Sequence, residues 1–264
     1  MALDWVNKIQ KHIDKKYATA SFVSKNPDLL IVLGGDGTIL EAARKFHHTS
    51  NPLILGLNLG NVGFLASVRN PENFINSIDQ FLKGKFTVLE RMVLSAEVLR
   101  SGRKVFSSEV LNEVVMQSVF GMVDLEVLAG GSSIRKIRGS GVLVATATGS
   151  TAYNLSAHGP IVMPNIKCLI ITELMDHNIP TPSIVVKYNE EVTVKISGFR
   201  QKGILSISKN KEKADVILIA DGDKISSLKK GDIINIKSSN HLVRFVETEP
   251  DYFFKSLKDK FAVR

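Results

Sequence analysis

The residues best suited to chemistry lie in one short stretch, Gly34-Gly35-Asp36-Gly37-Thr38. Glycines let backbone N–H groups approach an anion closely, and a helix that starts there favours negative charge. Asp36 is an acid where a phosphate would bind, and accepting a proton or holding a cation would each account for it. Asp36 can also be interpreted as an ordinary turn or cap residue. The context favours a functional role, because the stretch stands between a strand and a helix.

The flanking elements explain how this stretch would be held in place. Leu29–Leu33 is a short apolar run without a polar face, which predicts a buried strand. After the glycines, apolar residues recur at nearly helical spacing up to Phe46, and Thr38 with Glu41 has the spacing of a capping box. The turn is therefore expected between the carboxyl end of a strand and the start of a helix, where open α/β sheets bind ligands.

The first part of the chain has α/β patterning. Leu3–Lys16 predicts an amphipathic helix, and Tyr17 to Gly84 then follows the order strand, strand, helix, strand, helix, with Tyr17–Val23 as the first, short extended piece. We predict an α/β domain over residues 1–92, completed by a C-terminal helix within residues 245–264.

The later part is different. From about Phe86 onwards, short alternating segments predict strands, with Thr151–His158 as the one helical segment before helical spacing returns over Tyr252–Phe261. The segment Val110–Ser118 is among the predicted strands. This pattern predicts a mostly-β domain over residues 93–244.

Composition narrows the class of protein. The 264 residues are 44% hydrophobic and 23% charged, which is ordinary for a soluble protein. The net charge of +8 suits an anionic ligand, but no basic block with interleaved aromatic residues indicates a nucleic acid partner. A single cysteine, Cys168, excludes a disulfide framework and a cysteine-based zinc site. With no signal-peptide pattern and no run of membrane-spanning length, we expect a cytoplasmic protein without a membrane partner.

Two further segments carry binding chemistry. Asn112-Glu113 lies among apolar residues, where a polar pair must be partnered or face a pocket. An asparagine amide can bind the adenine edge, and an exposed edge position is an equal alternative. Thr148–Ser156 follows the predicted strand Val142–Ala147 and is rich in glycine and small hydroxyl residues that suit a sugar or phosphate, although it can also be a capped helix start. Asp221-Gly222-Asp223 predicts first of all a hairpin turn.

Other common catalytic patterns are missing from the sequence. It contains no P-loop, no dinucleotide-binding glycine fingerprint and no nucleophile elbow. Its six histidines do not cluster along the chain, so hydrolase and zinc-enzyme interpretations are weak.

Taken in order, these motifs resemble those of the NAD kinase family. GGDGT alone also occurs in diacylglycerol and sphingosine kinases, but the ordered set is far more specific and extends over nearly the whole chain. The matching segments are LGGDGT at Leu33–Thr38, GLNLGNVGFLA at Gly56–Ala66, NE at Asn112–Glu113, RGSGV at Arg138–Val142, TGSTAYNLSAHGPIV at Thr148–Val162, SIVV at Ser183–Val186 and ADG at Ala220–Gly222.

The resemblance implies transfer of a phosphoryl group from ATP, or from another donor, to the 2′-hydroxyl of the adenosine ribose of NAD. It implies Mg²⁺ as the cation, a β-rich NAD-binding domain and a homo-oligomer, commonly a dimer or tetramer. Asp36 would be the general base. The implied nucleotide contacts are Gly34, Gly35, Gly37 and Thr38 in the turn, Phe64 against adenine, Asn112 and Glu113 on the adenosine, Arg138 and Ser140 towards the nicotinamide, Thr148, Thr151, Ala152, Tyr153, Asn154, Leu155 and Ser156 along the nucleotide, and Asp223.

The chain departs from the family pattern at three places. Leu3–Lys16 is helical where the family usually begins with a strand, Asn61 stands where a basic residue is common, and Ser140 replaces the aspartate of the usual RGDG. The alternatives are a non-catalytic nucleotide-binding module of the same fold and a lipid kinase. The retained Asp36 argues against the first, and the NE and TGSTAYN segments argue against the second.

Overall fold

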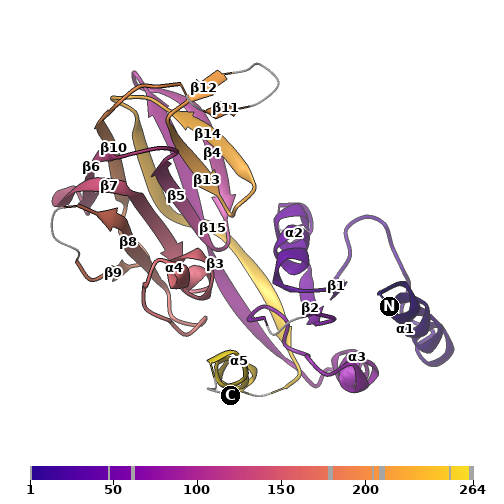
Figure 1. Ribbon diagram of the computed structural model, residues 1–264. Coiled ribbons are helices and arrows are strands. Elements are labelled where there is room, and N and C mark those ends of the chain that lie inside the picture. Colours follow the sequence, from indigo (N-terminus) through magenta and orange to yellow (C-terminus); the bar gives the residue numbers. More distant parts are fainter. Residues whose placement is uncertain are drawn as a thin grey trace. The chain divides into compact units, whose positions relative to one another are not determined.

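The computed structural model describes residues 2–46, 48–60, 63–177, 181–203, 205–207, 212–249 and 251–261. These residues form two compact units (Figure 1). Unit 1 comprises residues 1–91 and 241–264, and unit 2 comprises residues 92–240. Two long strands, β3 (Thr87–Arg100) and β15 (Ile233–Glu247), belong to both units because the chain crosses the boundary within them. Asn61 lies outside the described residues.

Unit 1 is an α/β unit in which two short parallel strands pair in register from Leu29↔Leu53 to Leu33↔Leu57. The end of β15 continues this sheet by pairing with the second strand at Arg244↔Leu53. Its core includes buried Leu55 and Phe74. The strands are β1 (Leu29–Leu33) and β2 (Leu53–Leu57), and the helices are α1 (Ala2–Lys16), α2 (Asp36–Phe46), η1 (Pro71–Asn73), α3 (Phe74–Leu82) and α5 (Tyr252–Phe261).

The extended piece predicted over Tyr17–Val23 is wrong at its start, because the chain continues from α1 into a turn. The Tyr17 N–H donates to Ile13 O at 2.8 Å, and the Ala20 N–H donates to Tyr17 O at 3.0 Å. No strand is assigned before β1 in the described residues. These local hydrogen bonds satisfy backbone groups that a strand would have offered to a neighbouring strand.

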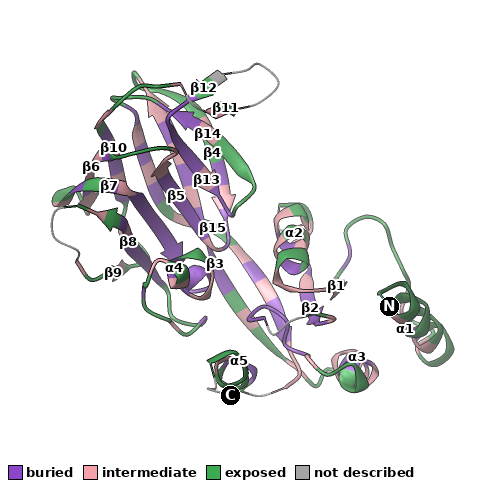
Figure 2. Ribbon diagram, viewed as in Figure 1, coloured by how far each residue is buried: buried purple, intermediate pink, exposed green. Residues whose placement is uncertain are grey.

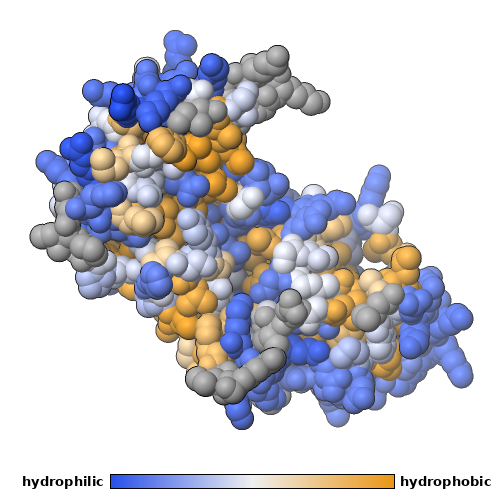
Figure 3. Space-filling model, in the orientation of Figure 1, coloured by the Kyte–Doolittle hydropathy of each residue, from blue (hydrophilic) through white to orange (hydrophobic). Residues whose placement is uncertain are grey.

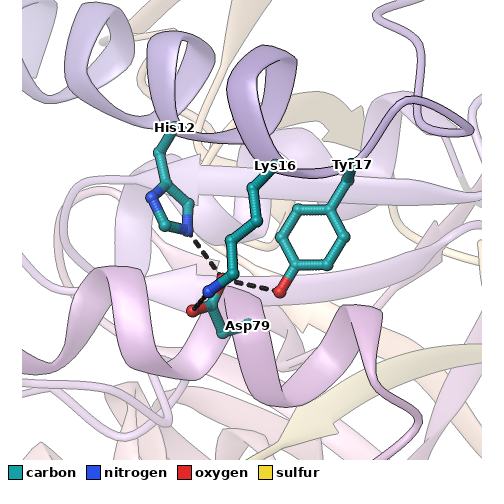
Figure 4. Close-up of polar contacts among 4 residues, drawn as sticks. All are labelled: His12, Lys16, Tyr17 and Asp79. Atoms are coloured by element: carbon teal, nitrogen blue, oxygen red, sulfur yellow. Dashed lines mark hydrogen bonds and ion pairs between the residues drawn. The ribbon is translucent and has the colours of Figure 1, made fainter.

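Helix α1 is amphipathic, and one charged cluster fastens it to α3 (Figure 4). The Asp79 carboxylate of α3 lies 2.7 Å from His12 Nε2 and accepts hydrogen bonds from Lys16 Nζ at 2.5 Å and Tyr17 Oη at 2.8 Å. Burial raises the pKa of Asp79, but these three partners outweigh it and hold the pKa well below the usual value. The opposite, solvent-facing surface of α1 is mostly hydrophilic (Figure 3).

Unit 2 is built mainly from antiparallel strands. From β10 the pairing order is β10-β6-β7-β5-β13-β14. The last part of β7, which pairs with β5, also pairs with β8, and β8 pairs in turn with β9. The bounds are β4 (Arg103–Val110), β5 (Glu113–Ser118), β6 (Val123–Ala129), β7 (Ser132–Thr146), β8 (Cys168–Asp176), β9 (Ile184–Lys187), β10 (Val192–Phe199), β11 (Leu205–Ile207), β12 (Glu212–Ala214), β13 (Val216–Ala220) and β14 (Lys224–Leu228), with η2 (Gly149–Thr151) and α4 (Tyr153–Ser156) after β7.

Alternate side chains of these strands build a large apolar core, and Figure 2 shows the unit 2 strands as largely buried. Leu94, Met116, Val144 and Leu218 are fully buried members of this core. The predicted class, an α/β part and a mostly-β part, is confirmed by these elements. Among the described residues, no helix combines the length and apolar character needed to cross a membrane.

Candidate functional site

The glycine turn of unit 1 lies between β1 and α2, as the sequence predicted, but α2 begins at Asp36. The capping role predicted for Thr38 is therefore wrong, since Thr38 lies within the first turn of the helix. An ideal Cβ on Gly34 would lie 2.7 Å from Thr38 Oγ1, so the Thr38 side chain occupies that space. Ideal Cβ atoms on Gly35 and Gly37 would meet nothing within 4 Å. The latter two glycines thus leave the backbone open to a ligand at a helix N-terminus.

The Asp36 carboxylate is oriented by the loop that follows β2. Its Oδ2 accepts the Phe64 N–H at 2.7 Å, and its Oδ1 accepts the Leu65 N–H at 3.0 Å. An ideal Cβ on Gly63 would lie only 2.1 Å from Asp36 Oδ1. A residue without a side chain is therefore needed at this position for the loop to come close to Asp36. Sequence reasoning identified both segments but missed this contact between them, which spans 28 residues. The result is a half-buried carboxylate in one fixed orientation.

Phe64, expected against adenine, is 2% exposed in unit 1. Its ring centroid lies 5.7 Å from that of Phe253, on α5. The Phe64 carbonyl accepts a long hydrogen bond of 3.4 Å from the buried Arg91 side chain. Arg91 also donates to the Tyr252 hydroxyl, and its guanidinium lies 4.9 Å from the Phe245 ring centroid. The Phe64 side chain is thus part of the core beneath the loop that orients Asp36. Its contact with adenine stays a prediction.

In unit 2, Asn112 and Glu113 lie where one strand ends and the next begins. β4 ends at Val110 and β5 starts at Glu113, so the prediction of one strand over Val110–Ser118 is wrong. The interruption allows Asn112 to be half-buried while Glu113 is only 6% exposed. Neither residue is a simple exposed edge residue.

Glu113 is a buried acid with an unusual proton affinity. Burial, and then the nearby Asp221 charge, raise the pKa of Glu113 to about 8, against a smaller opposing effect from the Tyr153 backbone hydrogen bond. Its Oε2 is buried without a hydrogen-bond partner in the described part of the chain. At neutral pH the side chain is therefore mainly a neutral carboxylic acid, which can both donate to and accept from a hydroxyl group.

The Thr148–Ser156 segment packs directly against Asn112. A Cβ on Gly149 would lie 2.2 Å from Asn112 O, and the Glu113 carboxyl accepts the backbone N–H of Tyr153. The predicted helix over Thr151–His158 is wrong in extent, because the chain forms the short helices η2 and α4 instead. Unit 2 therefore brings the second and third predicted binding segments together.

The side chains of this segment divide by exposure. Thr148 and Asn154 are buried, Thr151, Ala152 and Leu155 are intermediate, and Tyr153 and Ser156 are exposed. The Asn154 amide is used inside the unit: its Nδ2 donates to Ser150 O and Pro160 O at 3.3 and 3.1 Å, and its Oδ1 accepts from Thr172 Oγ1 at 2.7 Å. Asn154 thus shapes the segment, and its contact with a nucleotide stays a prediction.

The remaining predicted residues lie elsewhere in unit 2. Arg138 and Ser140 are both on β7. Arg138 Nε lies 3.7 Å from Asp124 Oδ1, and its side chain is 61% exposed. Asp223 is exposed in the β13–β14 hairpin, whose pairing confirms the predicted hairpin turn. The buried acid of that turn is Asp221, for which the sequence offered one signal, its position directly after an apolar strand.

Comparison with known proteins decides the family. The model of the ATP-NAD kinase N-terminal domain matches residues 3–86, and that of the C-terminal domain matches residues 111–248. This chain belongs to the ATP-NAD kinase family. The NAD kinase of Geobacter metallireducens is 37% identical over 252 residues, covering 95% of this chain and 84% of the relative. The NAD kinase of Syntrophotalea carbinolica is 34% identical, covering 88% and 77%.

Solved structures agree on the fold. A crystal structure titled as an Archaeoglobus fulgidus NAD kinase in complex with ATP matches with a TM-score of 0.75 and 25% identity, covering 97% of this chain and 93% of that one. A yeast NADH kinase complexed with NADH matches with a TM-score of 0.79 and 23% identity, covering 90% and 67%. The two-domain fold of this family is thus confirmed for this chain.

Proposed function

We propose that this chain transfers a phosphoryl group from ATP, or from another phosphoryl donor, to the 2′-hydroxyl of the adenosine ribose of NAD, and that Asp36 is the general base. The observation that carries the proposal is the Asp36 carboxylate, which two backbone N–H groups hold beside an open glycine turn. Membership of the ATP-NAD kinase family supports the choice of substrates.

The geometry of Asp36 suits proton transfer. An ionised carboxylate has about four acceptor positions, and the Phe64 and Leu65 N–H groups use one on each oxygen. Positions therefore remain for a substrate hydroxyl. Since phosphoryl transfer to an alcohol depends mainly on positioning and on neutralising charge, a base fixed in one orientation is what the reaction needs.

The donor set of unit 1 fits Mg²⁺ that arrives with a nucleotide. Mg²⁺ is usually held by one or two carboxylates together with substrate phosphates. The Asp36 oxygens satisfy this, and no group of three potential ligands surrounds Asp36 in the described ranges. When bound, Mg²⁺ neutralises phosphate charge. The Gly35 and Gly37 backbone would lie near the same phosphates.

Unit 2 would bind the adenosine part. The Asn112 amide offers a donor and an acceptor for adenine, and the neutral Glu113 carboxyl can bond a ribose hydroxyl. A cytoplasmic homo-oligomer, a dimer or tetramer, belongs to the same proposal. Support for the oligomer comes from large exposed apolar side chains on or beside β8 and β9, namely Met175, Val185 and Tyr188. Light scattering of the purified chain would measure the assembly.

The test is a coupled assay of NADP formation from NAD and MgATP. Asp36→Asn should lower kcat by about 10²–10⁴, the usual contribution of a general base, while KM for NAD changes much less. Glu41→Gln is the matched control, because it neutralises an exposed acid on the same helix. Near-normal turnover of Asp36→Asn would remove Asp36 from the catalytic role.

The same assay separates the remaining possibilities. A non-catalytic binding module would bind NAD without forming NADP. Replacing ATP with other nucleoside triphosphates or with polyphosphate identifies the donor, and replacing NAD with NADH identifies the preferred acceptor.

A further inference from the structure

The link from β4 to β5, which comprises Leu111, Asn112 and the first residue of β5, Glu113, is held by one carboxylate. Asp221 accepts the N–H of all three residues, from Leu111 at 2.8 Å, from Asn112 at 2.8 Å and from Glu113 at 3.2 Å. Asp221 is 7% exposed and adopts a left-handed backbone conformation, with φ of 47°. Such strain in a non-glycine residue persists only when the surroundings enforce it.

The carbonyl groups of the same link are also satisfied. Leu111 O accepts from Thr146 Oγ1 at 2.6 Å, Asn112 O accepts from the Thr146 N–H at 2.9 Å, and Glu113 O accepts from the Asp221 N–H at 3.0 Å. Thus Asp221 and Thr146 together satisfy all six backbone polar groups of the link. A backbone bonded this completely has one arrangement, although only its last residue, Glu113, belongs to a strand.

The Asn112 side chain contrasts with its backbone. It is half-buried, and its amide forms no hydrogen bond with any described residue. We propose that Asp221 is a positioning residue, which fixes the link so that the Asn112 amide is oriented for the adenosine part of NAD. This inference rests on the proposed function, because it concerns the same binding site. An amide oriented before binding loses less entropy when the ligand arrives.

The other end of β13 offers an internal comparison. Asp215 immediately precedes β13, and its Oδ2 accepts the N–H groups of Lys202 and Gly203 at 2.8 and 2.9 Å. It is 8% exposed, close to the value for Asp221. Both acids therefore hold a backbone segment, but only Asp221 holds the predicted adenosine-binding link. Asp215→Asn is thus a matched control for loss of a buried carboxylate.

The Asp221 charge also acts on Glu113, which provides a second readout. The strands next to Glu113 present uncharged side chains: Ala145 of β7 pairs with Glu113, and Ala220 of β13 pairs with the adjacent Val114. From α4, the Tyr153 backbone N–H donates to the Glu113 carboxyl. After burial, the Asp221 charge is the second cause that raises the pKa of Glu113. Removing this charge should therefore shift the pH dependence of NAD binding towards lower pH.

The experiment compares Asp221→Asn with Asp215→Asn in the full chain. With MgATP saturating, Asp221→Asn should raise KM for NAD about tenfold, the effect of about one lost charge-assisted hydrogen bond, and kcat should change less than about threefold. The pH profile of KM should move to lower pH. Asp215→Asn should leave KM and its pH profile unchanged, even if it lowers stability.

Amide hydrogen exchange tests the same contact without turnover. Exchange at Leu111, Asn112 and Glu113 should accelerate in Asp221→Asn but not in Asp215→Asn. If Asp221→Asn does not fold, Asp221→Ser, which keeps one acceptor, takes its place. Unchanged KM and pH profile in a folded variant would overturn the inference. A wild-type chain that forms no NADP would instead refute the proposed function, while the exchange data would still report whether Asp221 holds the link.

Discussion

Replacing Glu113 with glutamine should make the chain more stable at alkaline pH. The pKa of Glu113 is about 8 in the folded chain, against an ordinary value of 4.5. Because the folded chain binds the proton more tightly, it holds more protons than the unfolded chain between these values, and its stability falls as pH rises. Glu113→Gln keeps the size and the acceptor for the Tyr153 N–H but cannot ionise, so this loss should disappear.

The size of the effect follows from the two pKa values. Their difference, 8 minus 4.5, is about 3.5, which corresponds to about 5 kcal/mol once Glu113 is fully ionised. When the pH rises from 5.5 to 8.5, single-site linkage lowers the free energy of unfolding of the wild-type chain by about 3 kcal/mol relative to that of Glu113→Gln. That is a large share of the stability of a typical domain.

The assay is urea unfolding of the wild-type and variant chains at both pH values. Far-UV circular dichroism is the suitable probe, because the only tryptophan in the sequence, Trp5, lies in unit 1 and Glu113 lies in unit 2. Glu97→Gln, which removes an exposed ion pair with Lys104, should show no such pH-dependent difference. If Glu113→Gln differs from wild type by the same free energy at both pH values, the burial argument is refuted.

Four further outcomes are expected. Asn112→Ala should weaken NAD binding by about 1–3 kcal/mol with little change in melting temperature, measured by calorimetry. Ser140→Asp should lower KM about fivefold, more for NAD than for NADH, whose ring is uncharged. Gly63→Ala should lower kcat, because its Cβ would displace the Asp36 carboxylate. Asp79→Asn should lower the melting temperature at neutral pH, and the difference from wild type should shrink as the pH falls below about 4 and disappear only where the folded-state carboxyl, whose pKa is held well below the usual value, is protonated too.

Local pattern predicted two elements to the residue. Leu29–Leu33 is a strand and Tyr252–Phe261 is a helix, each with the bounds that the sequence indicates. In these segments composition and periodicity agree with the final structure. They were less informative for long strands: β7 begins at Ser132, although only its apolar last third, from Val142, predicted a strand. The polar first half is a strand because β6 pairs with it.

The site was predictable in its members but not in its contacts. Asp36, Asn112 and Glu113 stand out because a polar residue among glycines or apolar residues requires an explanation. Nothing local indicates that Phe64 and Leu65 donate to Asp36, or that Asp221 accepts from a link about 110 residues earlier. Such contacts depend on tertiary structure, and so does the raised pKa of Glu113, which requires both burial and the Asp221 charge.

The two units use the same interaction in opposite directions. In unit 1, backbone N–H groups of a loop orient a carboxylate, Asp36, that would do the chemistry. In unit 2, a carboxylate, Asp221, orients a loop whose side chain, Asn112, would bind the substrate. In each arrangement, hydrogen bonds between a carboxylate and backbone N–H groups fix a functional side chain, so its orientation depends on the position of the backbone. This is why Gly63, which lets the loop approach Asp36, and Asp221, which holds the link, are the informative positions to alter.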